Sequence, residues 1–135
     1  MTRARKQTKT VLIADDDLEI LGLTRALLRQ RGFDVIEASD GDEAMRQLLE
    51  NRPDLVILDV MMPGQSGWEV CRSIRESESL KNTGVIMLTG VGERMNEMTS
   101  PLYGADGHLD KPFDFNALDE LITRVLEKRD QAKTG

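Results

Sequence analysis

Carboxylates stand directly after two apolar runs of this chain. The run Val11–Ala14 is followed by Asp15 and Asp16, and the run Leu55–Leu58 is followed by Asp59. Carboxylates that lie within a few ångströms of one another raise each other's pKa and destabilise a fold unless a cation lies between them. An oxygen-only cluster suits Mg²⁺, which binds one or two carboxylates, keeps waters and completes its octahedron with phosphate oxygens. The pattern predicts a magnesium site, provided that both runs end at the same place.

Two further apolar runs end in groups that can bind phosphate. The stretch "VIMLTG" ends in Thr89 and Gly90, and a weaker run around Leu109 leads to Lys111. A hydroxyl, a backbone N–H and an ammonium group all donate hydrogen bonds to phosphoryl oxygens. Each also has a simpler interpretation, because threonine favours strands, glycine favours turns and lysine is common at edges.

Helix capping is the simpler interpretation of the acidic run after the first apolar segment, because carboxylates favour the positive end of a helix. We accept it for Asp17. We do not accept it for Asp15 and Asp16, since capping does not explain why Asp59 and Lys111 follow other strands.

Strand-length apolar runs alternate with segments of helical period along the whole chain. The runs lie at 11–14, 35–36, 55–58, 85–88 and around 109, and the central ones are apolar on both faces, as buried parallel strands are. Helical stripes are expected after the cap residues Asp17, Asp40, Ser66 and Asp114, the first ending at Gly32 and the second at Pro53. A short, labile helix is expected between Gly92 and Ser100.

This alternation predicts an α/β fold with one parallel sheet. Right-handed crossovers bring the carboxyl ends of all parallel strands to one edge, where such folds bind ligands. The carboxylates, the threonine and the lysine should therefore meet there.

Length and charge limit the classes of function. The 135 residues suit one domain, expected at 10–128, between a flexible basic tail at 1–9 and a C-terminal tail at 129–135. The first nine residues carry a charge of +4, so the rest of a chain with net charge −6 carries −10, which disfavours nucleic-acid binding. No apolar stretch is long enough to span a membrane, and a cytoplasmic location is the default. The lone Cys71 is interpreted as a packing residue.

Four stretches of the sequence, in order, resemble the signature motifs of the response regulator receiver domain. They are "VLIADDD", "LVILDVMMPGQSGWEV", "VIMLTG" and "HLDKPF". The segment "GFDVIEASDGDEAM" adds to the likeness, which covers about Thr10 to Leu126 and is similar to stand-alone receivers of the chemotaxis type. The resemblance implies a doubly wound (βα)5 domain, flavodoxin-like, with a five-stranded parallel sheet in the order 2-1-3-4-5.

The resemblance also implies roles for individual residues. Asp59 would be the phosphoacceptor, attacking the phosphoryl group of a phosphohistidine on a histidine kinase or phosphotransfer protein. The implied magnesium ligands are Asp15, Asp16, Asp59 and the backbone carbonyl of Met61. The implied phosphoryl contacts are Lys111, the Thr89 hydroxyl and the Gly90 N–H. Pro112 would follow a cis peptide bond, and Gly64 and Gly67 would permit a tight backbone path around the acceptor.

Switching is implied to involve Thr89 and His108. His108 occupies the position where the family frequently has tyrosine or phenylalanine, and its charge near neutral pH would make switching sensitive to pH. A packed histidine without a gating role is the simpler alternative. Pro101 is less expected for the family and puts the usual output geometry in question.

Several questions about the whole protein stay open at this point. The expected output is noncovalent, through the face made by the fourth helix, fifth strand and fifth helix, to a downstream protein or in a phosphorylation-dependent homodimer. We expect no output domain within these residues and no enzyme beyond self-catalysed phosphoryl transfer and autodephosphorylation. The alternatives are a receiver fragment of a larger regulator or hybrid kinase, a purely structural receiver, and a phosphatase of the haloacid dehalogenase type with Asp15 as nucleophile.

Overall fold

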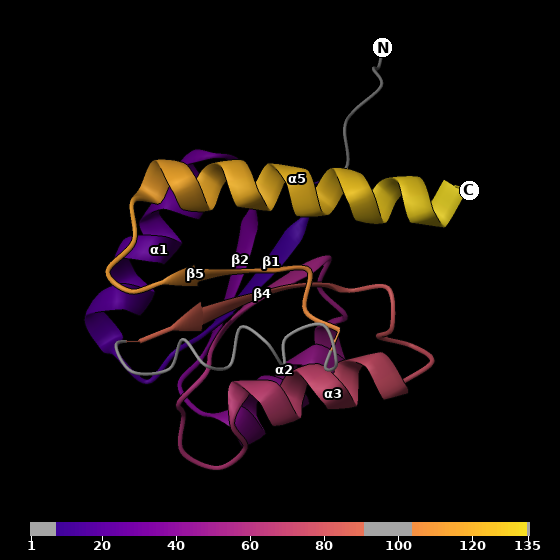
Figure 1. Cartoon of the computed structure of the whole chain (residues 1–135), viewed down its shortest axis with the longest axis horizontal. Helices are drawn as coiled ribbons and strands as arrows, with labels where there is room; N and C mark the ends of the chain where they lie inside the picture. Colours follow the sequence, from indigo (N-terminus) through magenta and orange to yellow (C-terminus); the bar gives the residue numbers. More distant parts are fainter. Residues whose placement is uncertain (1–7, 91–103, 135) are drawn as a thin grey trace.

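A single parallel sheet forms the centre of the molecule, in a computed structural model that describes residues 8–90 and 104–134 (Figure 1). Its five strands lie in the order β2-β1-β3-β4-β5, and every neighbouring pair is parallel. The strands are β1 (Thr10–Ala14), β2 (Asp34–Ala38), β3 (Leu55–Asp59), β4 (Gly84–Thr89) and β5 (Gly107–Asp110). The predicted flavodoxin-like order is confirmed.

Helices connect the strands within the described ranges. They are α1 (Leu18–Gln30), α2 (Gly41–Asn51), α3 (Gly67–Glu76) and α5 (Phe115–Thr134). The helix expected between Gly92 and Ser100, and most of the expected basic tail, lie outside the described residues. Among the helices that the structure does describe, none has the length and apolar character needed to cross a bilayer.

The last helix runs past the expected domain boundary at residue 128 and continues to Thr134. Its final turns carry ion pairs that a solvated tail would lack: Arg129 pairs with Asp106, and Asp130 pairs with Lys9. Residues 129–134 therefore lie within α5.

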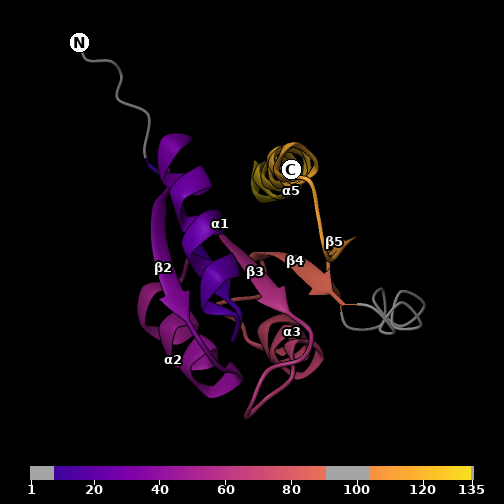
Figure 2. The ribbon, with the colours of Figure 1, turned by 90° about the vertical axis from the view of Figure 1, so that its left-hand side faces the viewer.

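Two apolar clusters, one on each face of the sheet, hold the layers together. α2 and α3 cover one face, and α1 and α5 cover the other, as the views in Figures 1 and 2 show. Side chains alternate along each strand, so in β4 Val85 and Met87 belong to the first cluster while Ile86 and Leu88 belong to the second. Cys71 lies in the first cluster, where burial raises the pKa of its thiol to about 11, in keeping with the packing role predicted for it.

The helix starts follow the predicted caps. Asp17 accepts hydrogen bonds from the N–H groups of Glu19 and Ile20, and Ser66 forms a capping box with Glu69. At α2, Asp40 accepts a hydrogen bond from the N–H of Glu43, as in a capping box. The Glu43 carboxylate, however, accepts from the N–H of Ser39 rather than from the N–H of the cap residue Asp40. These caps fix the first turns of the helices at the sheet edge where the carboxylates lie.

Two glycines permit the tight path of the chain after β3. Gly64 has a φ of +77°, a region that side chains with a Cβ rarely adopt. Gly67 packs so closely on β3 that a Cβ there would lie 2.5 Å from the carbonyl oxygen of Asp59. The tight backbone predicted around Asp59 is confirmed.

A buried ionic network lies at the other end of the sheet. The Asp106 side chain, 1% exposed, accepts hydrogen bonds from Arg75, from Arg129 and from the N–H of Val85. Arg75 also donates to the carbonyl oxygens of Gly104 and Thr83. The network ties α3, β4 and α5 together just before β5 begins.

Candidate functional site

The predicted chemical residues lie together at the carboxyl edge of the sheet. Asp15 and Asp16 follow β1, Asp59 ends β3, Thr89 ends β4 and Lys111 follows β5. Each therefore occupies a strand end, which is where parallel strands of a doubly wound sheet present their ligand-binding groups.

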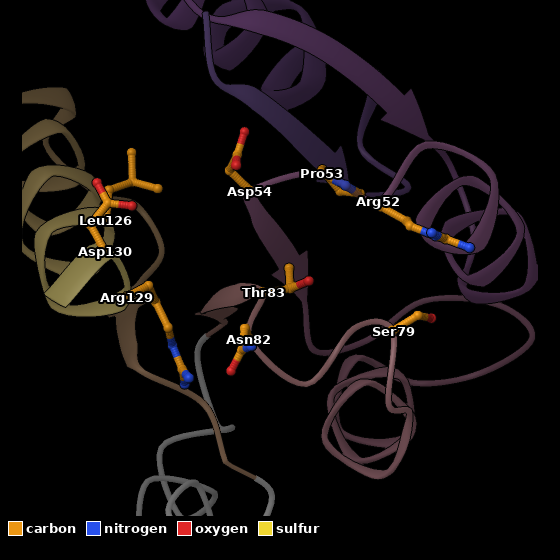
Figure 3. A pocket seen from close by; sticks show the side chains of 9 residues that line it. All are labelled: Arg52, Pro53, Asp54, Ser79, Asn82, Thr83, Leu126, Arg129 and Asp130. Atoms are coloured by element: carbon orange, nitrogen blue, oxygen red, sulfur yellow. The ribbon is translucent and has the colours of Figure 1, made fainter. Parts of the chain in front are cut away.

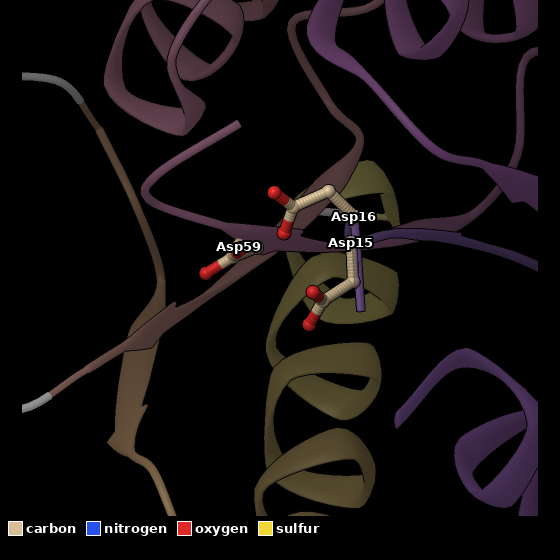
Figure 4. A group of neighbouring side chains, drawn as sticks. All are labelled: Asp15, Asp16 and Asp59. Carbon is tan, nitrogen blue, oxygen red and sulfur yellow. The ribbon is translucent and has the colours of Figure 1, made fainter. Parts of the chain in front are cut away.

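Three carboxylates converge at this edge (Figure 4). One oxygen from each of Asp15, Asp16 and Asp59 lies within 4.8 Å of the other two. Asp15 and Asp59 are buried, whereas Asp16 is exposed. The close approach predicted from the strand ends is confirmed, and the cluster has both a buried floor and an opening to solvent.

Lys111 supplies the positive charge of the site. Its Nζ lies 3.0 Å from Asp15 Oδ2 and 3.2 Å from Asp59 Oδ1. Burial alone would lower the pKa of Lys111, but the negative charges of Asp15 and Asp59 outweigh burial and raise that pKa, which keeps the lysine protonated. The Lys111–Pro112 peptide bond is cis, as the resemblance implied.

The surroundings of Asp59 disfavour its ionised form. Burial, followed by the charge of Asp15, raises its pKa from 3.8 to about 7, although Lys111 acts in the opposite direction. One lysine does not balance two buried carboxylates and a third beside them. A further cation would favour the ionised form of Asp59.

The donor set fits Mg²⁺. Asp15 Oδ1 accepts a hydrogen bond from the N–H of Asp17, and the buried Oδ2 faces the Lys111 ammonium at 3.0 Å, with no other donor among the described residues. A carboxylate oxygen whose one neighbouring donor is an ammonium group keeps lone pairs that can bind a hard cation. Asp16 adds an exposed carboxylate from the solvent side.

The Thr89 hydroxyl has a partner that the sequence reasoning missed. Thr89 Oγ1 donates to Asp110 Oδ1 at 2.6 Å, with a second acceptor, the carbonyl oxygen of Leu109, at 3.3 Å. Asp110 stands in the motif "HLDKPF", directly before Lys111, but its pairing with Thr89 follows from the strand register, which the motif does not contain.

The remaining predicted residues surround this centre. Met61 lies in the loop after β3 with an exposed side chain, Gly90 follows β4, and His108 lies in β5 opposite Met87. The metal contact of the Met61 carbonyl, the phosphoryl contact of the Gly90 N–H and the switching role of His108 stay predictions.

A separate cleft of about 190 Å³ opens at the opposite, amino-terminal edge of the sheet (Figure 3). Its lining residues are Arg52, Pro53, Asp54, Ser79, Asn82, Thr83, Leu126, Arg129 and Asp130. Three of the charged groups there already have partners: Arg129 pairs with Asp106, Asp130 pairs with Lys9, and Asp54 accepts the N–H of Thr10. The carboxyl edge is therefore the better candidate for chemistry.

Comparison with protein families gives one match over most of the chain. The family model described as "Response regulator receiver domain" matches residues 11–123. Among curated proteins, the chain is 44% identical to the transcriptional regulatory protein ResD of Bacillus subtilis over 85% of this chain and 45% of that protein. It is 38% identical to the transcriptional regulatory protein CpxR of Escherichia coli over 87% of this chain and 49% of that protein. The chain spans about half the length of these relatives.

Solved structures agree with this match. A response regulator from Chloroflexus aurantiacus superposes with a TM-score of 0.85 at 32% identity, covering 90% of this chain and 99% of that one. The chemotaxis response regulator CheY4 of Vibrio cholerae superposes with a TM-score of 0.82 at 32% identity, covering 88% and 99% respectively. These findings leave the haloacid dehalogenase alternative without support.

Proposed function

This chain belongs to the response regulator receiver domain family of two-component systems, and we propose that Asp59 is the residue that accepts a phosphoryl group. The observation that carries the proposal is the environment of Asp59, a buried carboxylate 3.2 Å from the Lys111 ammonium and beside two further carboxylates. The donor is a phosphohistidine on a histidine kinase or phosphotransfer protein.

The transfer needs positioning and charge balance more than covalent assistance. An Asp59 oxygen forms the new P–O bond while the P–N bond to the donor histidine breaks, and the leaving imidazole takes its proton from solvent. Lys111 is held at the site by Asp15 and neutralises charge on a phosphoryl oxygen. The Thr89 hydroxyl and the Gly90 N–H donate to another.

A bound Mg²⁺ would supply charge neutralisation for the phosphoryl oxygens and for the carboxylates themselves. Asp15, Asp16, Asp59 and the Met61 carbonyl would hold it. The hydrogen bond from the Asp17 N–H to Asp15 Oδ1 fixes the orientation of the Asp15 carboxylate, whose Oδ2 faces Lys111 in the acidic cluster.

Labelling with acetyl phosphate tests the proposal. With Mg²⁺, wild type should gain one phosphoryl group by mass spectrometry, mapped to the peptide that contains Asp59, and Asp59→Asn should gain none. Asp17→Asn is a matched control, because it removes a neighbouring carboxylate that caps α1 and asparagine also caps helices well. Labelling of Asp59→Asn at the wild-type rate, or labelling that a chelator leaves unchanged, would refute the proposal, and a label on Asp15 would revive the haloacid dehalogenase alternative.

The signal is proposed to leave through noncovalent contact at the face that includes β5 and α5. Two further properties belong to the proposal: a cytoplasmic location, and the absence of enzymatic activity beyond phosphoryl transfer to Asp59 and its hydrolysis. Comparing the proteins captured with and without beryllofluoride separates a downstream partner from a homodimer. Proteins captured equally in both conditions would contradict a phosphorylation-dependent surface.

His108 is the proposed gating residue on β5, beside Met87 and two residues before Asp110. If it gates switching through its charge, the pH dependence of beryllofluoride-dependent partner binding should change in His108→Phe. Identical pH profiles for the two proteins would leave His108 as a packing residue.

A further inference from the structure

The resting position of the Thr89 hydroxyl is set by Asp110. Thr89 Oγ1 lies 2.6 Å from Asp110 Oδ1 and 3.3 Å from the Leu109 carbonyl oxygen. A hydroxyl has one proton to donate, and the shorter bond, to a carboxylate, is the stronger one. The Thr89 hydroxyl therefore donates its proton toward β5, to the Asp110 carboxylate.

The backbone holds the two side chains in this arrangement. Thr89 and Asp110 are register partners in the parallel pair β4·β5, so their side chains leave the same face of the sheet. The N–H of Lys111 donates to the Thr89 carbonyl oxygen at 2.6 Å, which extends the pairing to the residue after Asp110. Thr89 is 1% exposed, so solvent water has little access to replace Asp110 as an acceptor.

We propose that Asp110 is a positioning residue that holds the Thr89 hydroxyl in the resting state and competes with the phosphoryl group for its proton. This inference rests on the proposed function, in which phosphorylated Asp59 draws Thr89 inward. The exchange breaks the bond to Asp110, so Asp110 opposes switching and keeps the unphosphorylated population in the resting form.

Removal of the acceptor should favour the phosphorylated form. In Asp110→Ala the hydroxyl loses its shorter contact and keeps the longer one to the Leu109 carbonyl oxygen, which competes less well with a phosphoryl oxygen. Loss of a negative charge near the site would also favour anion binding, whether or not Thr89 is involved. The two causes differ in one respect: only the first requires the threonine hydroxyl.

A double-mutant cycle separates these causes. The measured quantity is the affinity for beryllofluoride with saturating Mg²⁺, followed by the fluorescence of Trp68, the only tryptophan, or by amide NMR shifts. The proteins are wild type, Asp110→Ala, Thr89→Val and the double variant, with Asp110→Asn as an isosteric variant that retains an acceptor oxygen. Urea unfolding verifies that each is folded.

Asp110→Ala should bind beryllofluoride about tenfold more tightly than wild type, the order of effect of one hydrogen bond to a charged group. In the Thr89→Val background the same substitution should change the affinity less than about twofold, and Asp110→Asn should lie between wild type and Asp110→Ala. Equal gains in both backgrounds would show that Asp110 acts through its charge alone and overturn the inference, as would no gain in either. A wild type that fails to bind beryllofluoride would instead overturn the proposed function, and this inference with it.

Discussion

Asp59→Asn should stabilise the metal-free protein at neutral pH, even though it removes the proposed phosphoacceptor. Folding raises the pKa of Asp59 from 3.8 to about 7, chiefly because the carboxyl is buried and next because Asp15 lies beside it. At about 1.4 kcal/mol per pH unit, this rise corresponds to about 4 kcal/mol of folding free energy lost when Asp59 ionises. The attraction of Lys111 is already contained in that pKa, so asparagine, a neutral side chain of the same shape, should recover ~2–4 kcal/mol.

The sign of the pH dependence follows from proton binding. Between pH 3.8 and about 7 the folded state binds a proton that the unfolded state has released, so wild-type stability falls as the pH rises through this window. Asp59→Asn lacks this contribution. The difference between the two proteins should therefore be close to zero near pH 4 and largest above pH 7.

Urea unfolding at a series of pH values, with a chelator present, measures the difference. Above pH 7, adding Mg²⁺ should reduce the difference in unfolding free energy between Asp59→Asn and wild type. An ion that binds only the folded state stabilises that state by mass action, and this ion needs the Asp59 carboxylate, which only wild type has. Asp17→Asn is again the control and should show no such pattern. Equal free energies of unfolding for wild type and Asp59→Asn at pH 8, or a difference that does not shrink toward pH 4, would refute the electrostatic account of the site.

Two further predictions concern the scaffold and are measured by the same unfolding assay. Asp106→Ala should destabilise the fold by ~3–5 kcal/mol, because it leaves two partly buried arginines without their shared carboxylate. Glu78→Ala, at an exposed position, is the control and should have little effect. A loss of less than about 1 kcal/mol of unfolding free energy in Asp106→Ala would contradict the structural role of the network. Gly67→Ala should lower the free energy of unfolding by ~1–3 kcal/mol and weaken Mg²⁺ binding, because the added Cβ would lie 2.5 Å from the Asp59 carbonyl oxygen. Gly22→Ala on α1 is the control; its Cβ would meet a side-chain tip at 3.8 Å, so it should be neutral or stabilising. Equal effects of the two substitutions would contradict the close packing at Asp59.

Most of the fold could be predicted because its signals are local. Buried parallel strands read as short apolar runs, and the caps Asp17 and Ser66 mark helix starts by side-chain type and spacing alone. The end of α5 could not be placed in this way. Its last turns have little apolar pattern, and they are held by ion pairs to Asp106 and Lys9, which are distant in sequence.

The same distinction applies to the site. The convergence of Asp15, Asp59 and Lys111 follows from strand ends that share one edge, so it could be predicted once the alternation of strands and helices was recognised. The contact between Thr89 and Asp110 could not, because it depends on which residues of β4 and β5 face each other. Register is a property of the paired strands, and the sequence of one strand does not state which residue of its neighbour faces Thr89.

The two ends of β5 are held in different ways, and this has a mechanical consequence. Asp106, just before β5, forms an ion pair with Arg129 near the C-terminal end of α5. Lys111, just after β5, lies four residues before the first residue of α5. α5 is thus clamped far from the acidic edge and connected directly to it at its start. A displacement of Lys111 would therefore reach α5 first at its amino-terminal turns, and it would disturb the packing of Leu118 and the ion pair between Asp119 and Arg31 before it reached the contact at Arg129.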